Sequence, residues 1–493
     1  MTRQNGIIGG GLLEKQDEQE RSSQSTANWW LDLIRPSIMK RGGGPRKQIG
    51  RTAYLDGLRG FAAFLVYWHH HQLWPRQEYA ADLVFENVFG FENRYYFACL
   101  PVVRTFFTGG HFAVSVFLVI SGYVLSLKSL SLIHAGEFAK LGDTLASALF
   151  RRWIRLHIPI LLVSFCFMLS WHLFGIWNIS PERKPTFREE LWNFYVEFKN
   201  YSFVFRDGGT PWFPYNFPTW TIPVEFRGSL IIYTSLLAFS RFTRTARLTC
   251  NGLLMLYFIY IVDGWFGAMF LSGMTLCELD LLARSNDLPR FISRLEPWKT
   301  SIFYTLFVCS ILLGGVPSHS PSFKLRDAPG WYLLSFLKPQ AMYDYKWFYL
   351  FWAATFLVAS IPRIGWLRAF FETRFNLYLG HISFALYLIH GPVLWCLGDR
   401  LYVATGYQRP AHEMHMSGWV NAFPLSKNGV FGMELAFLAP HLILLPFTLW
   451  LAEVVTKLFD TPVANFTQSA YRKMVAPASA PPPAPHPRAT VMD

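Results

Sequence analysis

The amino-acid sequence predicts an all-α integral membrane protein, with about ten transmembrane helices around a polar, positively lined cavity and with disordered tails. Three features predict this class, and the first two are features of composition. Hydrophobic residues make up 52% of the 493 positions, and only 16% are charged, which is too few for a soluble chain of this length. The third feature is the recurrence of long apolar runs, each of about the length that a membrane-spanning helix needs.

The apolar runs divide the chain into elements. We expect spans near residues 55–74, 111–127, 158–177, 225–240, 250–262, 265–281, 302–316, 347–361, 377–396 and 431–458. Residues 51–465 then form one transmembrane domain. The polar first 50 residues and the Pro- and Ala-rich residues 466–493 are expected to be disordered tails, because neither has enough apolar surface to fold.

The charged residues predict an orientation. The net charge of +13 is spread along the chain rather than gathered in one tract, which argues against nucleic-acid binding. If the N-terminus is cytoplasmic, the inner loops are richer in Lys and Arg than the outer loops, as the positive-inside rule requires. Both termini then face the cytoplasm, and we expect a multi-pass protein of the endoplasmic reticulum or plasma membrane. The six cysteines are dispersed, without a disulfide framework or CxxC spacing, which favours a packing role. His412 and His415 have neither HExxH spacing nor a clear third ligand, so we predict no metal site.

The first expected span carries the most informative polar residues. Arg59 and His70 are eleven residues apart, so in a helix they lie on nearly the same face, about 16 Å apart along the axis. Charged and titratable side chains on one face of a membrane helix are costly unless that face borders a polar cavity. Asp56 can pair with Arg59 at the helix end. His69 and His71 point about 100° to either side of His70, which favours His70 as the functional histidine.

Five short motifs occur in an order that resembles the membrane acyltransferase-3 family, and the polar tails and diverged loops look most like its fungal members. The first motif is LDGLRG at residues 55–60, followed by His70, similar to the family's Arg and His with ten residues between them. The other four are FLVISG at 117–122, RRWIR at 151–155, WTIPVE at 220–225 and ISFALYLIHGP at 382–392. The sequence departs from the family at Phe226, where a second acidic residue is common.

The resemblance implies transfer of an acyl group from acyl-CoA, most simply acetyl-CoA, to a hydroxyl group, with no bound cofactor. His70 is then the general base, because imidazole titrates near neutrality. Arg59 is always protonated, so it serves as the electrostatic partner of His70 or orients the donor. Arg151, Arg152 and Arg155 are expected at the inner mouth of the cavity, where guanidinium groups match the phosphates of CoA. The same cluster also fits an ordinary positive-inside anchor.

Four residues are candidates for binding the acceptor: Glu225, Trp220, Tyr387 and His390. Tyr387 and His390 are one helical turn apart and can line the same cavity. Structural roles stay open for two of the four. Glu225 follows Pro223 at the expected outer start of a helix, where a carboxylate also suits the helix dipole. His390 fits a satisfied structural histidine equally well.

The family implies an acceptor that is a lipid, a glycan or a secondary metabolite of polyketide or terpenoid type, and membrane lipids surround the helices. A membrane transporter or exporter of a polar or acylated metabolite is the competing interpretation, with Arg59 and His70 lining its path. Many transporters contain inverted repeats, which appear as two similar halves. The sequence shows no such halves, because the charged motifs crowd its first half.

Overall fold

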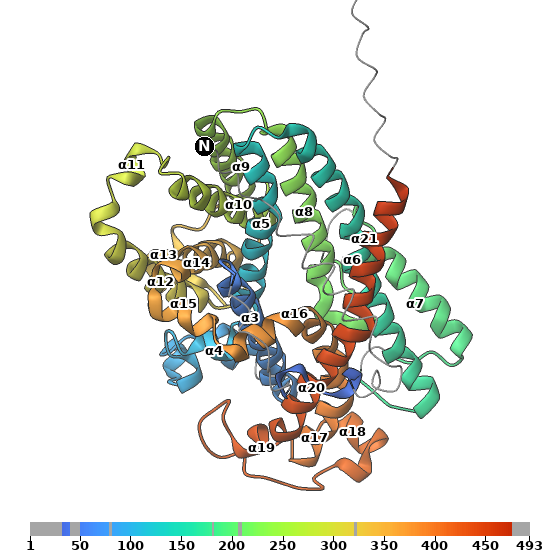
Figure 1. The fold of residues 1–493 in the computed structure, drawn as a ribbon. Helices are drawn as coiled ribbons and strands as arrows, with labels where there is room; N and C mark the ends of the chain where they lie inside the picture. The colour runs from blue at the N-terminus through green and yellow to red at the C-terminus, as the bar shows by residue number, and fades with distance from the viewer. Residues whose placement is uncertain are drawn as a thin grey trace, which may run out of the picture.

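A computed structural model describes residues 32–39, 50–77, 81–179, 182–205, 210–319 and 323–475. Within these ranges every regular element is a helix and no strand forms, as Figure 1 shows. The predicted all-α class is therefore confirmed.

The longer helices are α3 (Ala53–Leu73), α5 (Gly110–His134), α6 (Phe138–Phe174), α7 (Phe187–Ser202), α8 (Thr221–Ala238), α9 (Arg244–Tyr260), α10 (Trp265–Arg284), α12 (Lys299–Gly314), α14 (Lys346–Ser360), α16 (Arg374–Val393), α20 (His441–Val455) and α21 (Thr461–Met474). Short helices between them are α4 (Arg104–Thr108), α11 (Arg290–Ser293), α13 (Tyr332–Ser335), α15 (Gly365–Phe371), α17 (Asp399–Ala404), α18 (Pro410–His415) and α19 (Leu435–Leu438). The remaining segments are 3-10 or π-helical: Ser37–Met39, Trp74–Arg76, Ala81–Glu86, Phe91–Asn93, Phe97–Cys99, Pro214–Trp220, Glu296–Trp298, Leu325–Asp327, Ile361–Arg363, Leu394–Gly398, Ser417–Trp419 and Thr456–Asp460.

Each segment predicted as a span contains a helix, but fewer than ten are long and apolar enough to cross a membrane. In the described part of the chain six qualify: Gly110–His134, Phe138–Phe174, Trp265–Arg284, Glu296–Gly314, Arg374–Ala404 and Leu435–Met474. A seventh arises if Lys346–Arg363 and Gly365–Phe371, which are bent by 101°, form one broken span. The predicted number of about ten is not confirmed, because α3 and α8 carry charged residues within their apolar runs and α9 has only 17 residues.

The described structure continues beyond the predicted domain, residues 51–465, at both ends. Residues 32–39, expected in the N-terminal tail, pack on the C-terminal helices. The Lys457 ammonium donates to the Asp32 carbonyl at 2.8 Å, and Trp450 Nε1 donates to the Ile34 carbonyl at 2.9 Å. At the other end α21 continues to Met474, past the predicted limit of 465. The rest of the predicted tails, residues 1–31, 40–49 and 476–493, lies outside the described residues.

Helices α3, α5, α10 and α16 lie at the centre of the bundle in Figure 1, and small residues bring their backbones together. A Cβ atom added to Gly380 of α16 would lie 2.3 Å from the Asp56 carbonyl oxygen of α3, and one added to Gly60 would lie 2.3 Å from the Gly380 nitrogen. The α5–α10 contact is similar, since a Cβ on Gly122 would lie 1.9 Å from the Phe270 carbonyl oxygen. Small residues allow membrane helices this close approach, so polar groups on the facing sides of α3 and α16 meet.

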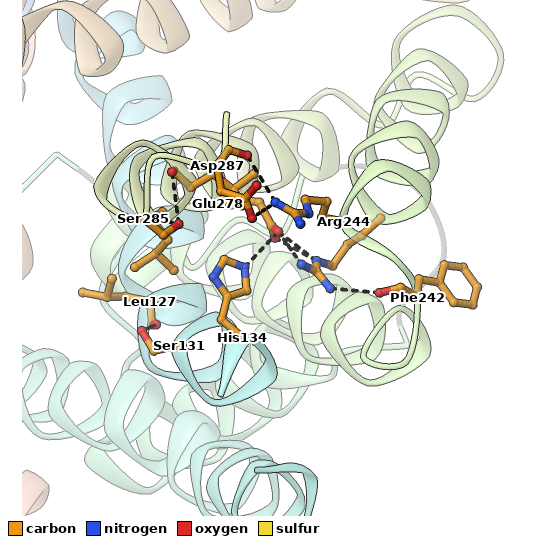
Figure 2. A network of polar contacts seen from close by, with 11 residues as sticks. Leu127, Ser131, His134, Phe242, Arg244, Glu278, Ser285 and Asp287 are labelled. Carbon is orange, nitrogen blue, oxygen red and sulfur yellow. Dashed lines mark hydrogen bonds and ion pairs between the residues drawn. The ribbon is translucent and has the colours of Figure 1, made fainter. Parts of the chain in front are cut away.

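A buried polar network fixes the ends of α5, α9 and α10. The Glu278 carboxylate of α10 accepts a hydrogen bond of 2.9 Å from Arg247 Nε of α9 and lies 3.1 Å from His134 Nε2 of α5. Figure 2 shows the contact between His134 and Glu278 as a dashed line. Arg247 and Glu278 are 4% and 2% exposed, and buried charges are tolerated when each has a partner. This network holds the end of α5 against α9 and α10.

Candidate active site

A cavity of about 250 Å³ opens between α3, α5, α6, α8 and α16. Three guanidinium groups and two carboxylates line it, which leaves a net positive charge: Arg59, Arg152, Arg155, Glu225 and Asp460. Hydroxyl groups and an imidazole complete the polar lining, from Ser121, Thr221, Ser383, Tyr387 and His381. A cavity with this lining can hold an anionic ligand inside an otherwise apolar bundle.

Arg59 lies on the cavity wall and is held by both α3 and α16. Its Nε donates to Ser383 Oγ at 3.0 Å, and its Nη2 donates to the Gly380 carbonyl at 3.1 Å. Nη2 also lies 3.2 Å from Asp56 Oδ1, so the ion pair expected at the start of this helix is present. Because 40% of its side chain is still exposed, Arg59 has guanidinium surface left for an anion in the cavity.

His70 has the environment that a general base requires. Its Nδ1 lies 2.9 Å from the Val66 carbonyl oxygen. A carbonyl oxygen only accepts hydrogen bonds, so in the neutral ring Nδ1 carries the proton and Nε2 keeps its lone pair. His70 is also partly exposed, whereas His69 is 5% and His71 is 0% exposed. Of the three consecutive histidines, His70 is therefore the one that combines a free ring nitrogen with accessible surface.

The two flanking histidines serve packing. His69 Nδ1 accepts a hydrogen bond of 3.2 Å from the Gly110 backbone N–H, which docks the start of α5 on α3. His71 Nδ1 lies 2.7 Å from the Tyr402 hydroxyl, which is in turn 3.2 Å from His441 Nε2. Both side chains thus connect α3 to other parts of the bundle.

His390 of α16 faces His70. Their ring centroids are 4.9 Å apart, because α3 and α16 run parallel and place these two residues at the same level. His390 is 1% exposed, and neither of its ring nitrogens has a hydrogen-bond partner among the described residues. A buried polar group without a partner is costly, so this arrangement favours contact with a ligand over a satisfied structural histidine.

His70 and His390 do not line the cavity that holds Arg59. His390 is seven residues beyond Ser383 on α16, about 10 Å further along the helix, and Tyr387 of the turn between them does line the cavity. Arg59 and His70 are separated by about 16 Å along α3. The structure does not bring these two into contact, as the helix geometry already implied, and the role of Arg59 as the electrostatic partner of His70 stays a prediction.

Arg152 and Glu225, expected at opposite mouths of the cavity, form an ion pair. Arg152 Nη2 contacts Glu225 Oε1, and Arg152 Nε donates to Ser229 Oγ at 2.8 Å. Placing the two on opposite sides of the membrane was therefore wrong. The physical reason is that the segment Pro214–Trp220 enters the bundle and packs on α16, so α8 starts at the depth of the arginine cluster.

The other two arginines of the cluster differ from Arg152. Arg151 Nε donates to the Ser147 carbonyl of its own helix at 3.1 Å, and Arg151 is not part of the cavity lining. Arg155 lines the cavity and is exposed. Of the three predicted phosphate ligands, Arg155 has the guanidinium group most accessible to a ligand.

Tyr387 and Trp220 lie on different surfaces. The Tyr387 hydroxyl lies 2.6 Å from Thr221 Oγ1 and donates to the Pro218 carbonyl, which links α16 to the start of α8 at the cavity. Trp220 is half-buried outside the cavity lining, and its ring lies 5.9 Å from that of Trp347. Tyr387 can therefore touch a ligand in this cavity, whereas Trp220 belongs to an adjoining aromatic cluster.

Sequence reasoning missed two cavity residues, Asp460 and His381. Asp460 ends the π-helical segment Thr456–Asp460, and His381 is an exposed residue of α16. For Asp460 the sequence offered one signal, because it lies at the end of a long apolar run. An acidic side chain there is costly in a membrane unless it has a function. In the described ranges no group of three or more His, Cys, Asp or Glu residues could hold a metal ion, so these additions do not create a metal site.

Comparisons with known proteins identify the family of the chain. Residues 52–451 match the family model described as an acyltransferase domain. The chain is 31% identical over 422 residues to O-acetyltransferase PaAT-1 of Phomopsis amygdali, which covers 79% of this chain and 81% of the relative. It is 23% identical over 473 residues to acyltransferase clz18 of Cochliobolus lunatus (85% and 96% covered) and 25% identical over 401 residues to acyltransferase R4 of a Phoma species (71% and 84% covered).

No solved structure matches the chain. The family model nevertheless spans most of the sequence, including every motif from residue 55 to residue 392, and the relatives named above are fungal acyltransferases. The apolar helices agree with a protein of the membrane. The chain belongs to the acyltransferase-3 family and is an enzyme that transfers acyl groups other than aminoacyl groups.

Proposed function

We propose that the chain is a membrane O-acyltransferase that moves an acyl group, most simply acetyl, from acyl-CoA to a hydroxyl group. The observation that carries the proposal is the contact of His70 Nδ1 with the Val66 carbonyl, which leaves Nε2 as the free ring nitrogen beside His390. A free imidazole nitrogen in a buried site is the group that can take a proton from an alcohol. The relative PaAT-1 is named an O-acetyltransferase, which supports oxygen as the acceptor atom and acetyl as the group.

The proposed chemistry uses His70 twice. Nε2 accepts the proton of the acceptor hydroxyl while its oxygen attacks the thioester carbonyl carbon, and the new C–O bond forms. The C–S bond then breaks, and the departing CoA sulfur takes the proton back from the imidazolium, so the ring returns to its starting state. General base catalysis of this kind contributes about 10² to 10⁴ in rate. The free nitrogens of His390 can bind the acceptor hydroxyl or the developing oxyanion.

The phosphates of the donor are proposed to bind in the cavity that Arg59 and Arg155 line. Arg59 and Arg155 line it with exposed guanidinium surface, which matches phosphate oxygens of CoA in a bidentate way. Arg152 is already bound to Glu225 and Ser229, so its contribution is to position this wall and to add positive charge. Arg151 contributes charge from outside the lining.

The acceptor is proposed to be a hydroxylated secondary metabolite of polyketide or terpenoid type, with a glycan as the alternative. The cluster of Trp220, Trp265 and Trp347 beside the cavity supports an acceptor with apolar surface, because aromatic faces bind rings and hydrocarbon at low entropic cost. Both termini are proposed to face the cytoplasm, in the endoplasmic reticulum or plasma membrane. Epitope tags at the two ends should then be reached by antibody after selective permeabilisation of the plasma membrane only.

The test of the proposed function is genetic complementation with a chemical readout. Deletion of the gene should leave a metabolite or surface glycan lighter by one acyl group, detected by mass spectrometry. Wild-type protein and His415→Ala, a change to an exposed histidine outside the cavity, should restore the acylated product. His70→Ala should be made and inserted to the same level and should not restore it. Full restoration by His70→Ala would refute the assignment of the base.

A further inference from the structure

A second pocket, of about 470 Å³, lies at the end of the bundle where α3 begins. It is enclosed by the start of α3, the end of α10, the turn after α14 and helix α15. Four arginines and a single carboxylate supply its charged lining: Arg51, Arg284, Arg363, Arg368 and Asp280. The proposed mechanism uses none of these residues, and the charges leave the pocket strongly positive.

Two of the arginines are held in place by carboxylates. Arg363 pairs with Asp280 of α10, whose second oxygen accepts a hydrogen bond of 2.9 Å from the Tyr123 hydroxyl. Arg368 Nε donates to Glu372 Oε1 at 2.9 Å. Such partners fix the direction of a guanidinium group while leaving other N–H groups to donate elsewhere.

The other two arginines face the pocket without such partners. Arg51 precedes α3 and Arg284 ends α10, and both are exposed. Neither makes a side-chain hydrogen bond or ion pair with the residues that the structure describes. A merely anchoring charge extends into water, whereas these two converge with two fixed guanidinium groups on one concavity. Convergent guanidinium groups are the arrangement that binds phosphate oxygens.

The rim of the pocket has the character of a membrane surface. Helix α15 turns away from the preceding helix by 101°, so it does not continue through the bundle. It carries Arg368 into the pocket while Trp366 and Phe370 are 55% and 44% exposed. The Trp366 ring also packs against Phe307 of α12, at 5.6 Å between centroids. An aromatic side chain beside a basic one is typical of a segment at the level of lipid headgroups.

We propose that this pocket binds the phosphate headgroup of an anionic phospholipid, with the acyl chains lying against α12 and α15. Basic pockets between membrane helices at a bilayer surface bind such headgroups. Only 11% of the apolar stretch within Glu296–Gly314 is buried, so α12 presents apolar surface on which the lipid chains can lie. A bound headgroup bridges α10, α15 and the start of α3, which is the helix that carries Arg59 and His70.

The site can be tested by the thermal stability of the purified full-length protein in a neutral detergent. Dioleoyl phosphatidylglycerol should raise Tm in a saturable way, and dioleoyl phosphatidylcholine should not. In the double variant Arg51→Gln/Arg284→Gln the half-maximal lipid concentration should rise about 25-fold, since each arginine near an anionic lipid is worth about a fivefold factor. These two residues are chosen because their change breaks no ion pair and leaves the fold intact.

The matched control is Arg290→Gln/Arg294→Gln, which removes two exposed arginines of the segment after α10 that do not line the pocket. It should keep the wild-type lipid response. An equal loss of response in both double variants would show a diffuse surface attraction and overturn the proposal. Stabilisation by 3′-phosphoadenosine 5′-diphosphate, equal to that by the lipid and lost in Arg51→Gln/Arg284→Gln, would assign the pocket to a nucleotide and also overturn it.

Discussion

The ion pair between Arg152 and Glu225 is the contact through which the structure most changes the interpretation of the sequence. Replacement of Arg152 by Gln removes both the ion pair and the hydrogen bond to Ser229, and it leaves the Glu225 carboxylate without its cation. Breaking a fully buried pair costs about 3–5 kcal/mol. The two side chains are 19% and 14% exposed, so water solvates the remaining charge and offsets part of this cost. We therefore expect the free energy of unfolding to fall by about 2 kcal/mol.

The expected loss is measurable as a change in Tm of the purified protein. At about 2 °C for each kcal/mol, Arg152→Gln should lower Tm by about 4 °C. The double variant Arg152→Gln/Glu225→Gln should recover at least half of this loss, because two amides need no counter-charge. Arg151→Gln is the matched control, since Arg151 bonds only to a carbonyl of its own helix, and it should change Tm by less than about 1 °C.

Enzyme kinetics distinguish a structural role of Arg152 from a role in binding the donor. Arg155→Gln should raise the KM for acyl-CoA about tenfold, because a hydrogen bond to a charged group is worth about 1.5–3 kcal/mol. Arg152→Gln should raise it less, since that guanidinium is already engaged by Glu225. If Arg152→Gln left Tm unchanged and raised the KM more than Arg155→Gln, Glu225 would not be the partner of Arg152 in the free enzyme. That result would refute the reasoning.

Two further predictions concern the packing of α3. His71→Ala removes the 2.7 Å contact to the Tyr402 hydroxyl in a fully buried site, so Tm should fall while activity for each folded molecule, measured on the monodisperse fraction, stays close to wild type. Gly380→Ala forces a Cβ to within 2.3 Å of the Asp56 carbonyl oxygen, so α3 and α16 must separate. Overpacking costs about 1–3 kcal/mol, and a shift of about 1 Å between His70 and the opposing helix can cost about 10² in kcat. Wild-type kcat in Gly380→Ala would contradict that coupling.

The sequence predicted the helices well because the information is local. Runs of apolar residues and their charged ends lie within single helices, and each of the ten predicted segments contains one. The choice of His70 over its neighbours could also be made from the geometry of one helix. The number of membrane-crossing helices was harder to predict, because a helix such as α8 can begin inside the bundle after an entering loop.

Contacts between distant segments could not be predicted. The pairing of Arg152 with Glu225 joins residues 73 positions apart, and nothing in either motif specifies that the two helices meet at that depth. The same holds for Asp460, which reaches the cavity from a π-helical segment near the end of the domain. The proximity of His70 and His390 depends on the parallel packing of α3 and α16, which follows from glycines whose role is visible only once both helices are placed.

The separation of about 16 Å between Arg59 and His70 suits a donor that must be held at two places. Acyl-CoA carries its phosphates and its thioester at opposite ends of a flexible pantetheine arm, so one donor molecule must contact two separate places. Arg59 is fixed to Ser383 and Gly380 near the start of α3, and His70 stands about 16 Å further along the same helix. Under the proposed mechanism α3 thus sets the separation between the phosphate end and the reacting end of the donor. The ten residues between Arg59 and His70 then set both their separation along α3 and the helix face on which they lie.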